Sequence, residues 1–209
     1  ESICADIAIL SASPCILPSW QALPYTPLAS NAKVFAERAS SLIHLANVSE
    51  SGVIDKKIVF ITTIRALLTP VPPLSYITQL KFPIEVGKDY DVEQIAKLLV
   101  EWGYTRVPRV TVRGEFSVRG EVLDVAPIGN RAENHTAYRL VFNFDTIEKI
   151  RLFNITSQAS LEELKKIELY PSKEIVWSDE RISILESNLS KIEEFEESYS
   201  TIIEELKQK

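Results

Sequence analysis

The sequence has no methionine and is poor in glycine, cysteine and histidine, with six, two and two residues of these types among 209. A chain without methionine has no initiator, so we expect a processed protein or a part of a longer one. Glycine makes up about 3% of the residues against a usual ~7%, which disfavours glycine-rich loops. No segment fits the Gly-x-x-x-x-Gly-Lys-Ser/Thr pattern that holds nucleotide phosphates.

Signatures of other chemical sites are missing as well. The sequence has no Gly-x-Ser-x-Gly or His-Glu-x-x-His motif and no nucleophilic cysteine with an evident partner. Cys4 and Cys15 are too few for a disulfide framework and match no metal-binding spacing. The apolar runs are too short to cross a membrane, and no signal peptide is visible. We therefore expect a cytoplasmic chain without catalytic residues, cofactor, metal or membrane contact.

Charge is unevenly distributed along the chain. The net charge is −6, from 23 basic and 29 acidic residues. Residues 160–209 hold 13 acidic and 7 basic residues, which accounts for the whole excess, because residues 1–159 hold 16 of each. A general DNA-coating role is disfavoured, since phosphate binding needs a basic surface, but a local basic patch within the neutral part is compatible with these numbers.

Apolar periodicity divides the chain into two kinds of structure. In the first part we expect strands at 6–10 and 57–62, a proline-rich loop at 14–27, and helices at 33–45 and 63–68. From about residue 80 we expect a helix at 92–102 and strands at 80–86, 107–112, 116–125, 138–144, 147–153 and 164–169. A single closing helix at 179–209 would begin at the N-cap Ser178. This pattern predicts part of an α/β layer followed by a small α+β domain with a curved antiparallel sheet.

Arginine usage is the strongest local signal. Between Leu98 and Glu148 every basic residue is an arginine: Arg106, Arg109, Arg113, Arg119, Arg131 and Arg139. Arginine makes bidentate contacts and is weakly hydrated, so it is favoured over lysine at specific interfaces. A sheet face carrying arginines is a plausible dock for an acidic protein. The alternative is a set of ordinary surface arginines that pair with Glu115, Glu121 and Asp145.

Several linked motifs resemble a known family. The central ones are Arg113-Gly-Glu-Phe-Ser-Val-Arg-Gly-Glu-Val-Leu-Asp-Val-Ala-Pro127 and Tyr138-Arg-Leu-Val-Phe-Asn-Phe-Asp. They resemble the interaction domain shared by the excision nuclease subunit UvrB and the bacterial transcription-repair coupling factors. The likeness extends over residues 15–175, through Trp20-Gln-Ala-Leu-Pro-Tyr25, 58–68, 157–164 and 167–171. The coupling factors are the closer match, because the interval from Tyr25 to Arg38 is too short for the DNA-gripping hairpin of UvrB.

The resemblance implies a fold and a domain plan. It implies an incomplete helicase-like parallel α/β layer without a P-loop, formed by residues 1–78 and 156–209. A UvrA-interaction domain, residues 79–155, would be inserted into it. The whole protein would be an ATP-dependent DNA translocase that also meets RNA polymerase and double-stranded DNA. Its motor, with ATP and magnesium, would lie outside this chain.

The resemblance also implies a binding site for UvrA. The UvrB arginines that make this contact align with Arg106, Arg119 and Arg139. Arg113 is added because it flanks the same segment. We expect Phe116, and Phe142 or Phe144, to supply apolar area. Two family positions differ, being Ser117 and Val141 here, which predicts fewer ion pairs or a different partner surface.

Two other functions compete with this one. The arginine-bearing sheet could bind nucleic acid, which predicts a steep salt dependence of DNA affinity. A residual nucleotide site could persist in the α/β layer, although the P-loop is missing.

Overall fold

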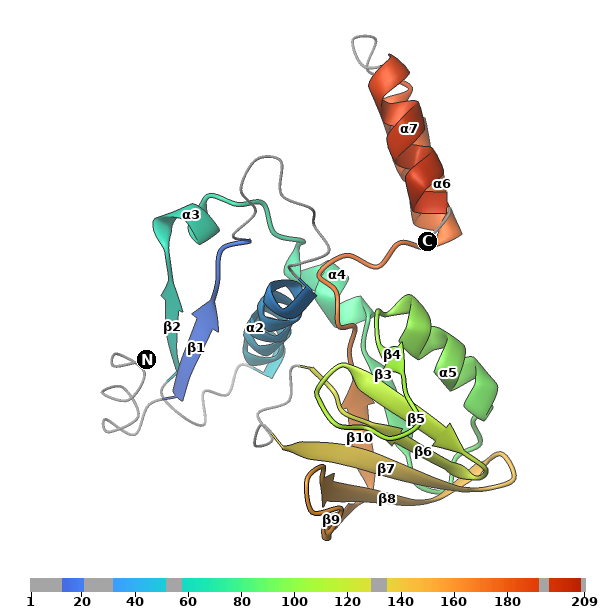
Figure 1. Ribbon diagram of the computed structural model, residues 1–209. Coiled ribbons are helices and arrows are strands. Elements are labelled where there is room, and N and C mark those ends of the chain that lie inside the picture. Colours follow the sequence, from blue (N-terminus) through green and yellow to red (C-terminus); the bar gives the residue numbers. More distant parts are fainter. Residues whose placement is uncertain (1–12, 21–31, 52–57, 129–134, 192–195, 208–209) are drawn as a thin grey trace. The chain divides into compact units, whose positions relative to one another are not determined.

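The computed structural model describes residues 13–20, 32–51, 58–128, 135–191 and 196–207, and the strand expected at 6–10 lies outside them. The chain divides into two compact units, one ending at Glu174 and one running from Ile175 to Lys209. Figure 1 shows their elements. The first unit carries a small α/β layer and the larger sheet, and each unit is described by itself.

The α/β layer is built on two strands and one long helix. Strand β1 (Ser13–Leu17) pairs in parallel with β2 (Ile58–Thr62), and α2 (Ala32–Ser51) packs beside β1 (Figure 1). Two short helices follow, α3 (Ile64–Leu67) and α4 (Leu74–Gln79). Apolar side chains of α2 and α4 form a core with Tyr170, because the helical period places Leu42, Ile43 and Ala46 on one face.

Two expectations for this layer need correction. Residues 14–17, expected in a proline-rich loop, belong to β1, where Pro14 pairs in register with Val59. The apolar run at 57–62 forms the expected strand, but Val59 and Phe60 in it are exposed. In the described part of the chain the parallel sheet comprises β1 and β2 alone, so a helicase-like layer is not shown.

The larger sheet has six strands in the order β4-β5-β6-β7-β8-β9. These are β4 (Thr105–Arg106), β5 (Glu115–Arg119), β6 (Val122–Val125), β7 (Thr136–Asn143), β8 (Thr146–Asn154) and β9 (Ser160–Leu164). Only β4 and β5 pair in parallel; all other neighbours are antiparallel. Strand β3 (Phe82–Glu85) pairs separately with β10 (Lys166–Leu169). The antiparallel sheet predicted for this region is therefore found as a mixed, mostly antiparallel sheet.

One face of this sheet forms the main core. Alternate residues of β5 to β8 lie on that face and are fully buried, among them Phe116, Leu123, Leu140 and Ile150. Helix α5 (Val92–Glu101) adds buried side chains to the same unit and begins where the Asp91 carboxylate accepts the amides of residues 93 and 94. Its C-cap is Trp102, and the next residue, Gly103, has a φ of 87° that suits a left-handed helix end.

The strand predictions differ from the structure in three places. Residues 107–112 are irregular, and the two-residue strand β4 lies just before them. The strand expected at 116–125 is a hairpin whose turn contains Gly120 with a φ of 57°. Residues 160–169 hold two strands, β9 and β10, in place of one at 164–169. The domain limits at residues 79 and 155 stay a prediction.

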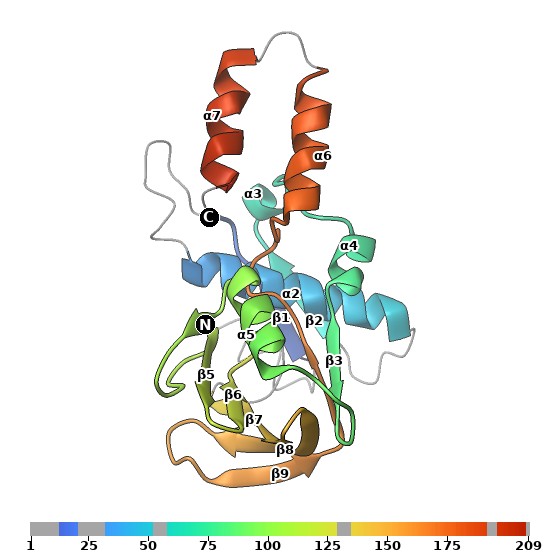
Figure 2. The same cartoon turned by 90° about the vertical axis from the view of Figure 1, so that its right-hand side faces the viewer.

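The second unit is a pair of helices. Helix α6 (Asp179–Leu189) starts at the predicted N-cap Ser178, whose hydroxyl accepts the amide of Arg181. Helix α7 (Glu196–Lys207) follows in the sequence, and Figure 2 shows the two helices side by side. Lys207 and Glu186 link them by an ion pair of 3.2 Å. The prediction of one continuous helix over 179–209 is wrong, because α6 already ends at Ser190.

Candidate partner-binding site on the six-stranded sheet

The face opposite the main core carries a cluster of charged side chains. Residues paired across an antiparallel ladder share a face, and successive residues alternate between faces. Asp124 of β6 pairs with Arg139 of β7, which pairs in turn with Arg151 of β8. Arg119 of β5 pairs with Val122, two residues before Asp124, and so lies on the same face. We call Arg119, Asp124, Arg139 and Arg151 the arginine face.

One buried carboxylate joins two of these arginines. The side chain of Asp124 is only 2% exposed, whereas those of Arg119 and Arg139 are 50% and 23% exposed. Arg119 Nη2 donates to Asp124 Oδ2 over 2.7 Å. Arg139 binds both oxygens of the carboxylate, from Nε to Oδ1 over 2.7 Å and from Nη2 to Oδ2 over 2.9 Å. This is a bidentate, charge-assisted contact of the strong kind.

Arg139 has two further contacts that fix its guanidinium. Its Nη2 donates to Gln158 Oε1 over 3.2 Å, and its Cζ lies 4.4 Å from the centre of the Phe153 ring. Hydrogen bonding to Asp124 holds the pKa of Arg139 above its ordinary high value, against an opposing effect of burial. Arg139 is therefore charged at every accessible pH. The formal charges of Arg119, Asp124 and Arg139 sum to +1.

Comparison with known proteins identifies the region that carries this face. Residues 82–175 match the UvrB interaction domain. The chain is 35% identical over 165 residues to the transcription-repair-coupling factor of Myxococcus xanthus, and 31% identical over 168 residues to that of Haemophilus influenzae. Over 207 residues, 99% of the chain, it is 29% identical to the factor of Borreliella burgdorferi. This chain is homologous to the transcription-repair-coupling factors. The predicted resemblance is confirmed.

The homologous region is a small part of these relatives. It covers 78% and 80% of this chain in the first two comparisons, but only 13% and 14% of the coupling factors themselves. Even the comparison over 99% of the chain covers 17% of the relative. The arginine face and all strands of the six-stranded sheet lie within residues 82–175, the part that matches the interaction domain.

The structure separates the other predicted arginines from this cluster. Arg106 is exposed on the edge strand β4. Its register partner is the core residue Phe116, so its position in the sheet lies on the opposite face from Arg119. Arg113 is half-buried in the loop between β4 and β5. Arg131 lies outside the described residues. The structure thus brings together Arg119 and Arg139 of the three aligned arginines.

The predicted aromatic contacts need correction. Phe116 is 0% exposed and belongs to the core, so its assignment as a contact residue is wrong. Phe142 of β7 is also buried, because it lies on the same core-facing side of the sheet as Phe116. Phe144 is 85% exposed in the turn between β7 and β8. That turn lies at the same end of the sheet as the β5–β6 turn, since the amide of Phe142 donates to Glu121 O over 2.8 Å.

Sequence reasoning missed the residues that hold the arginines. Asp124 was not among the expected partners of the arginines, yet it pairs with two of them. Glu115, one of the expected partners, instead accepts hydrogen bonds from Thr111 and Val112. Gln158 gave no signal beyond its place in a family-like segment, because its contact with Arg139 depends on a loop with a φ of 62° at Gln158 itself.

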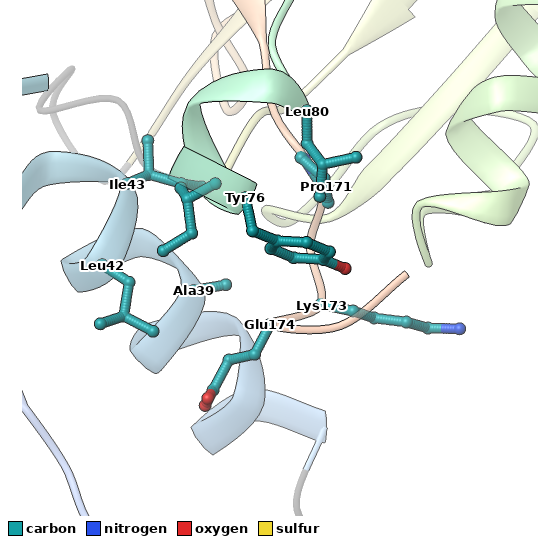
Figure 3. Close-up of a pocket in the computed structure, with 9 residues that line it drawn as sticks. Ala39, Leu42, Ile43, Tyr76, Leu80, Pro171, Lys173 and Glu174 are labelled. Carbon is teal, nitrogen blue, oxygen red and sulfur yellow. The ribbon is translucent and has the colours of Figure 1, made fainter. Parts of the chain in front are cut away.

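A second feature lies in the α/β layer. Figure 3 shows a hollow between α2, α4 and the segment after β10, lined mainly by apolar side chains such as Leu42 and Tyr76, with Glu174 beside it. It has room for about 10 Å³, roughly one water molecule. A nucleotide does not fit there. Within the described residues, no three His, Cys, Asp or Glu side chains form a metal-binding group, and no helix is long and apolar enough to cross a membrane.

Proposed function

We propose that this chain is the UvrA-recruiting module of a transcription-repair-coupling factor. Through the whole protein it links stalled RNA polymerase to nucleotide excision repair. The match of residues 82–175 to the UvrB interaction domain supports a protein-binding role. In this proposal, ATP hydrolysis and movement on double-stranded DNA belong to other regions of the coupling factor, and this chain needs neither ATP nor magnesium.

The observation that supports the proposal is the arginine face within the matched domain, where Arg119 and Arg139 are both bound to Asp124. A guanidinium has five N–H donors, and among the described residues Arg119 bonds only Asp124. Its half-exposed side chain therefore keeps donors for carboxylates of a partner. Arginines at such positions are typical hot spots of protein interfaces. The partner surface that fits is acidic.

Apolar area borders the arginine cluster. Val122 and Val141 pair on the same face, and both are half-buried. Phe144 adds an exposed ring at the end of the sheet. Ser117 lies on the arginine face but is fully buried, with its hydroxyl donating to Pro108 O over 3.1 Å. The two family departures thus replace charged contacts with a buried serine and an apolar pair, so that Arg119 and Arg139 carry the ionic part of the contact.

The test is UvrA binding by an Arg119→Ala variant, measured by isothermal titration calorimetry. We expect a loss of about 2 kcal/mol, roughly thirtyfold in affinity, because the variant removes an interface arginine. Arg65→Ala is the matched control: it removes an exposed arginine of α3, outside the matched domain, and leaves the affinity unchanged.

Two results would contradict the proposal. One is unchanged UvrA affinity of a folded Arg119→Ala variant. The other is a nucleic-acid role, which would appear as DNA binding that falls steeply with salt and is lost in the same variant while UvrA affinity is kept.

A further inference from the structure

We infer that Asp124 is a positioning residue that fixes Arg119 and Arg139 in one arrangement before a partner arrives. The inference rests on the proposed function and extends it to a residue that is itself too buried to touch a partner. The inference predicts a change in binding opposite to the one that charge alone predicts. Removing the negative charge of Asp124 makes the arginine face more basic, yet binding to an acidic surface becomes weaker.

The position of Asp124 in the sheet gives it this role. It lies in the middle of β6, a strand with neighbours on both sides, where its register partners are Ser117 and Arg139. Ladder hydrogen bonds on both sides restrict the backbone there. Both carboxylate oxygens are in use, since Oδ1 accepts from Arg139 and Oδ2 accepts from both arginines. One rigid carboxylate therefore sets the positions of two long side chains.

Gln158 supports the same arrangement from the next loop. Its amide nitrogen donates to Ile155 O over 2.7 Å, which aims its amide oxygen at Arg139. The loop is closed by Asn154, whose side-chain oxygen accepts the amides of Thr156 and Ser157, each over 2.9 Å. With the Phe153 ring against its guanidinium, Arg139 is held from three directions.

Fixing these side chains in advance affects binding in a defined way. An arginine that is free in solution loses rotamer entropy when an interface immobilises it, and this cost weakens association. Where the side chain is already held, the cost is absent. The contribution of Asp124 to binding is therefore geometric, while its charge opposes the attraction of an acidic partner.

The experiment compares two substitutions with equal change in charge. Asp124→Asn removes the shared carboxylate, and Glu121→Gln removes an exposed carboxylate in the turn next to Arg119. UvrA binding is followed by surface plasmon resonance, which separates association from dissociation. We expect Asp124→Asn to bind about tenfold more weakly, through faster dissociation. We expect Glu121→Gln to bind equally well or more tightly, with faster association.

A double-mutant cycle tests whether Asp124 acts through Arg119. Arg119→Ala in the Asp124→Asn background should cost much less than in the original chain, because the positioned side chain is already lost. A purely structural role predicts additive effects. Additive effects, or tighter binding by Asp124→Asn that matches Glu121→Gln, would overturn the inference. Unchanged binding of the single Arg119→Ala variant would instead show that the proposed function itself is wrong.

A second variant tests the inference if the Asp124→Asn variant does not fold. Gln158→Gly removes one holder of Arg139 at an exposed loop, and glycine suits the φ of 62° at that position. We expect about threefold weaker UvrA binding, because Arg139 is held less firmly. The melting temperature should change little, because the backbone strain that glycine relieves offsets the two side-chain hydrogen bonds lost with Gln158. Unchanged affinity of this variant would also overturn the inference.

Discussion

Glu115 shows how one side chain can order the loop that precedes the binding face. Its Oε2 atom accepts hydrogen bonds from Thr111 N, Thr111 Oγ1 and Val112 N over 2.7, 2.9 and 3.0 Å. Burial raises the pKa of Glu115, but the hydrogen bonds from Thr111 and Val112 outweigh that effect and hold the pKa below its ordinary value of 4.5. The ionised carboxylate therefore stabilises the folded chain.

A Glu115→Gln variant should lose this stabilisation in a pH-dependent way. The pKa of Glu115 is lower in the folded chain than in the unfolded chain. Its contribution is therefore complete well above pH 4.5 and disappears as the pH falls through the folded pKa. We expect the variant to lower the free energy of unfolding by about 1 kcal/mol at pH 7. Urea denaturation at pH 7 and pH 3 measures this.

The exposed Glu121, changed to glutamine, serves as the control and should alter stability little at either pH. A Glu115→Gln effect of equal size at pH 7 and pH 3 would contradict the assignment of the stabilisation to the ionised carboxylate.

Residue types were easier to predict than residue partners. The restriction to arginine between Leu98 and Glu148, together with the family-like motifs, selected Arg119 and Arg139. Their shared partner could not be read from spacing, since Asp124 is 5 residues from one and 15 from the other. The register of two hairpins brings them together. Phe116 was misassigned because the strand pattern left open which alternate residues face inward.

At the scale of elements, the β7–β8 hairpin presents an unusual turn. Phe144 has a φ of 56°, a left-handed conformation that costs a non-glycine residue about 1 kcal/mol. The segment 87–90 braces this end of the hairpin. Tyr90 N donates to Asp145 O over 2.7 Å, Gly87 N donates to Ile147 O over 2.8 Å, and Thr146 Oγ1 donates to Asp89 Oδ1 over 2.6 Å. The surrounding contacts thus hold an exposed aromatic ring on a strained backbone.

Replacing Phe144 should separate stability from binding. Phe144→Gly removes the backbone strain and no buried contact, so we expect the free energy of unfolding to rise by about 1 kcal/mol. Phe144→Ala keeps the strain and should leave stability close to that of the original chain. Both variants should bind UvrA more weakly, since both lack the ring. Urea denaturation and calorimetric titration of the same samples test this; a glycine variant no more stable than the alanine variant would contradict it.

Helices and strands with a regular spacing of apolar residues were predictable, whereas elements separated by short turns were not. Helices α2 and α5 and strands β7 and β8 were predicted within a few residues, apart from the longer C-terminal end of α2. The β5–β6 hairpin was read as one strand because its turn has only two residues, with Gly120 as the single signal. Helices α6 and α7 were read as one because apolar spacings of three and four residues continue in the sequence from 189 to 199.

At the scale of the whole first unit, a buried ion pair joins distant parts of the chain. Arg38 of α2 and Glu174 after β10 are 136 residues apart in sequence, and their side chains are 0% and 5% exposed. Arg38 Nη1 also donates to Pro18 O over 2.6 Å, and Trp20 Nε1 donates to Glu174 Oε1 over 3.2 Å. The pair thus connects the end of β1, α2 and the last residue of the unit.

Breaking this pair on one side should be worse than replacing both partners. Glu174→Ala leaves Arg38 charged and buried without its carboxylate, and we expect a loss of about 3 kcal/mol in the free energy of unfolding. In the double variant Arg38→Met with Glu174→Leu, apolar side chains fill the same space. We expect a smaller loss, because desolvation of both charges no longer opposes folding and only Trp20 and the Pro18 carbonyl lose a partner. Urea denaturation followed by tryptophan fluorescence measures both. Equal losses in the two variants would contradict this expectation, because they would show that leaving Arg38 charged and unpaired costs no more than removing the whole pair.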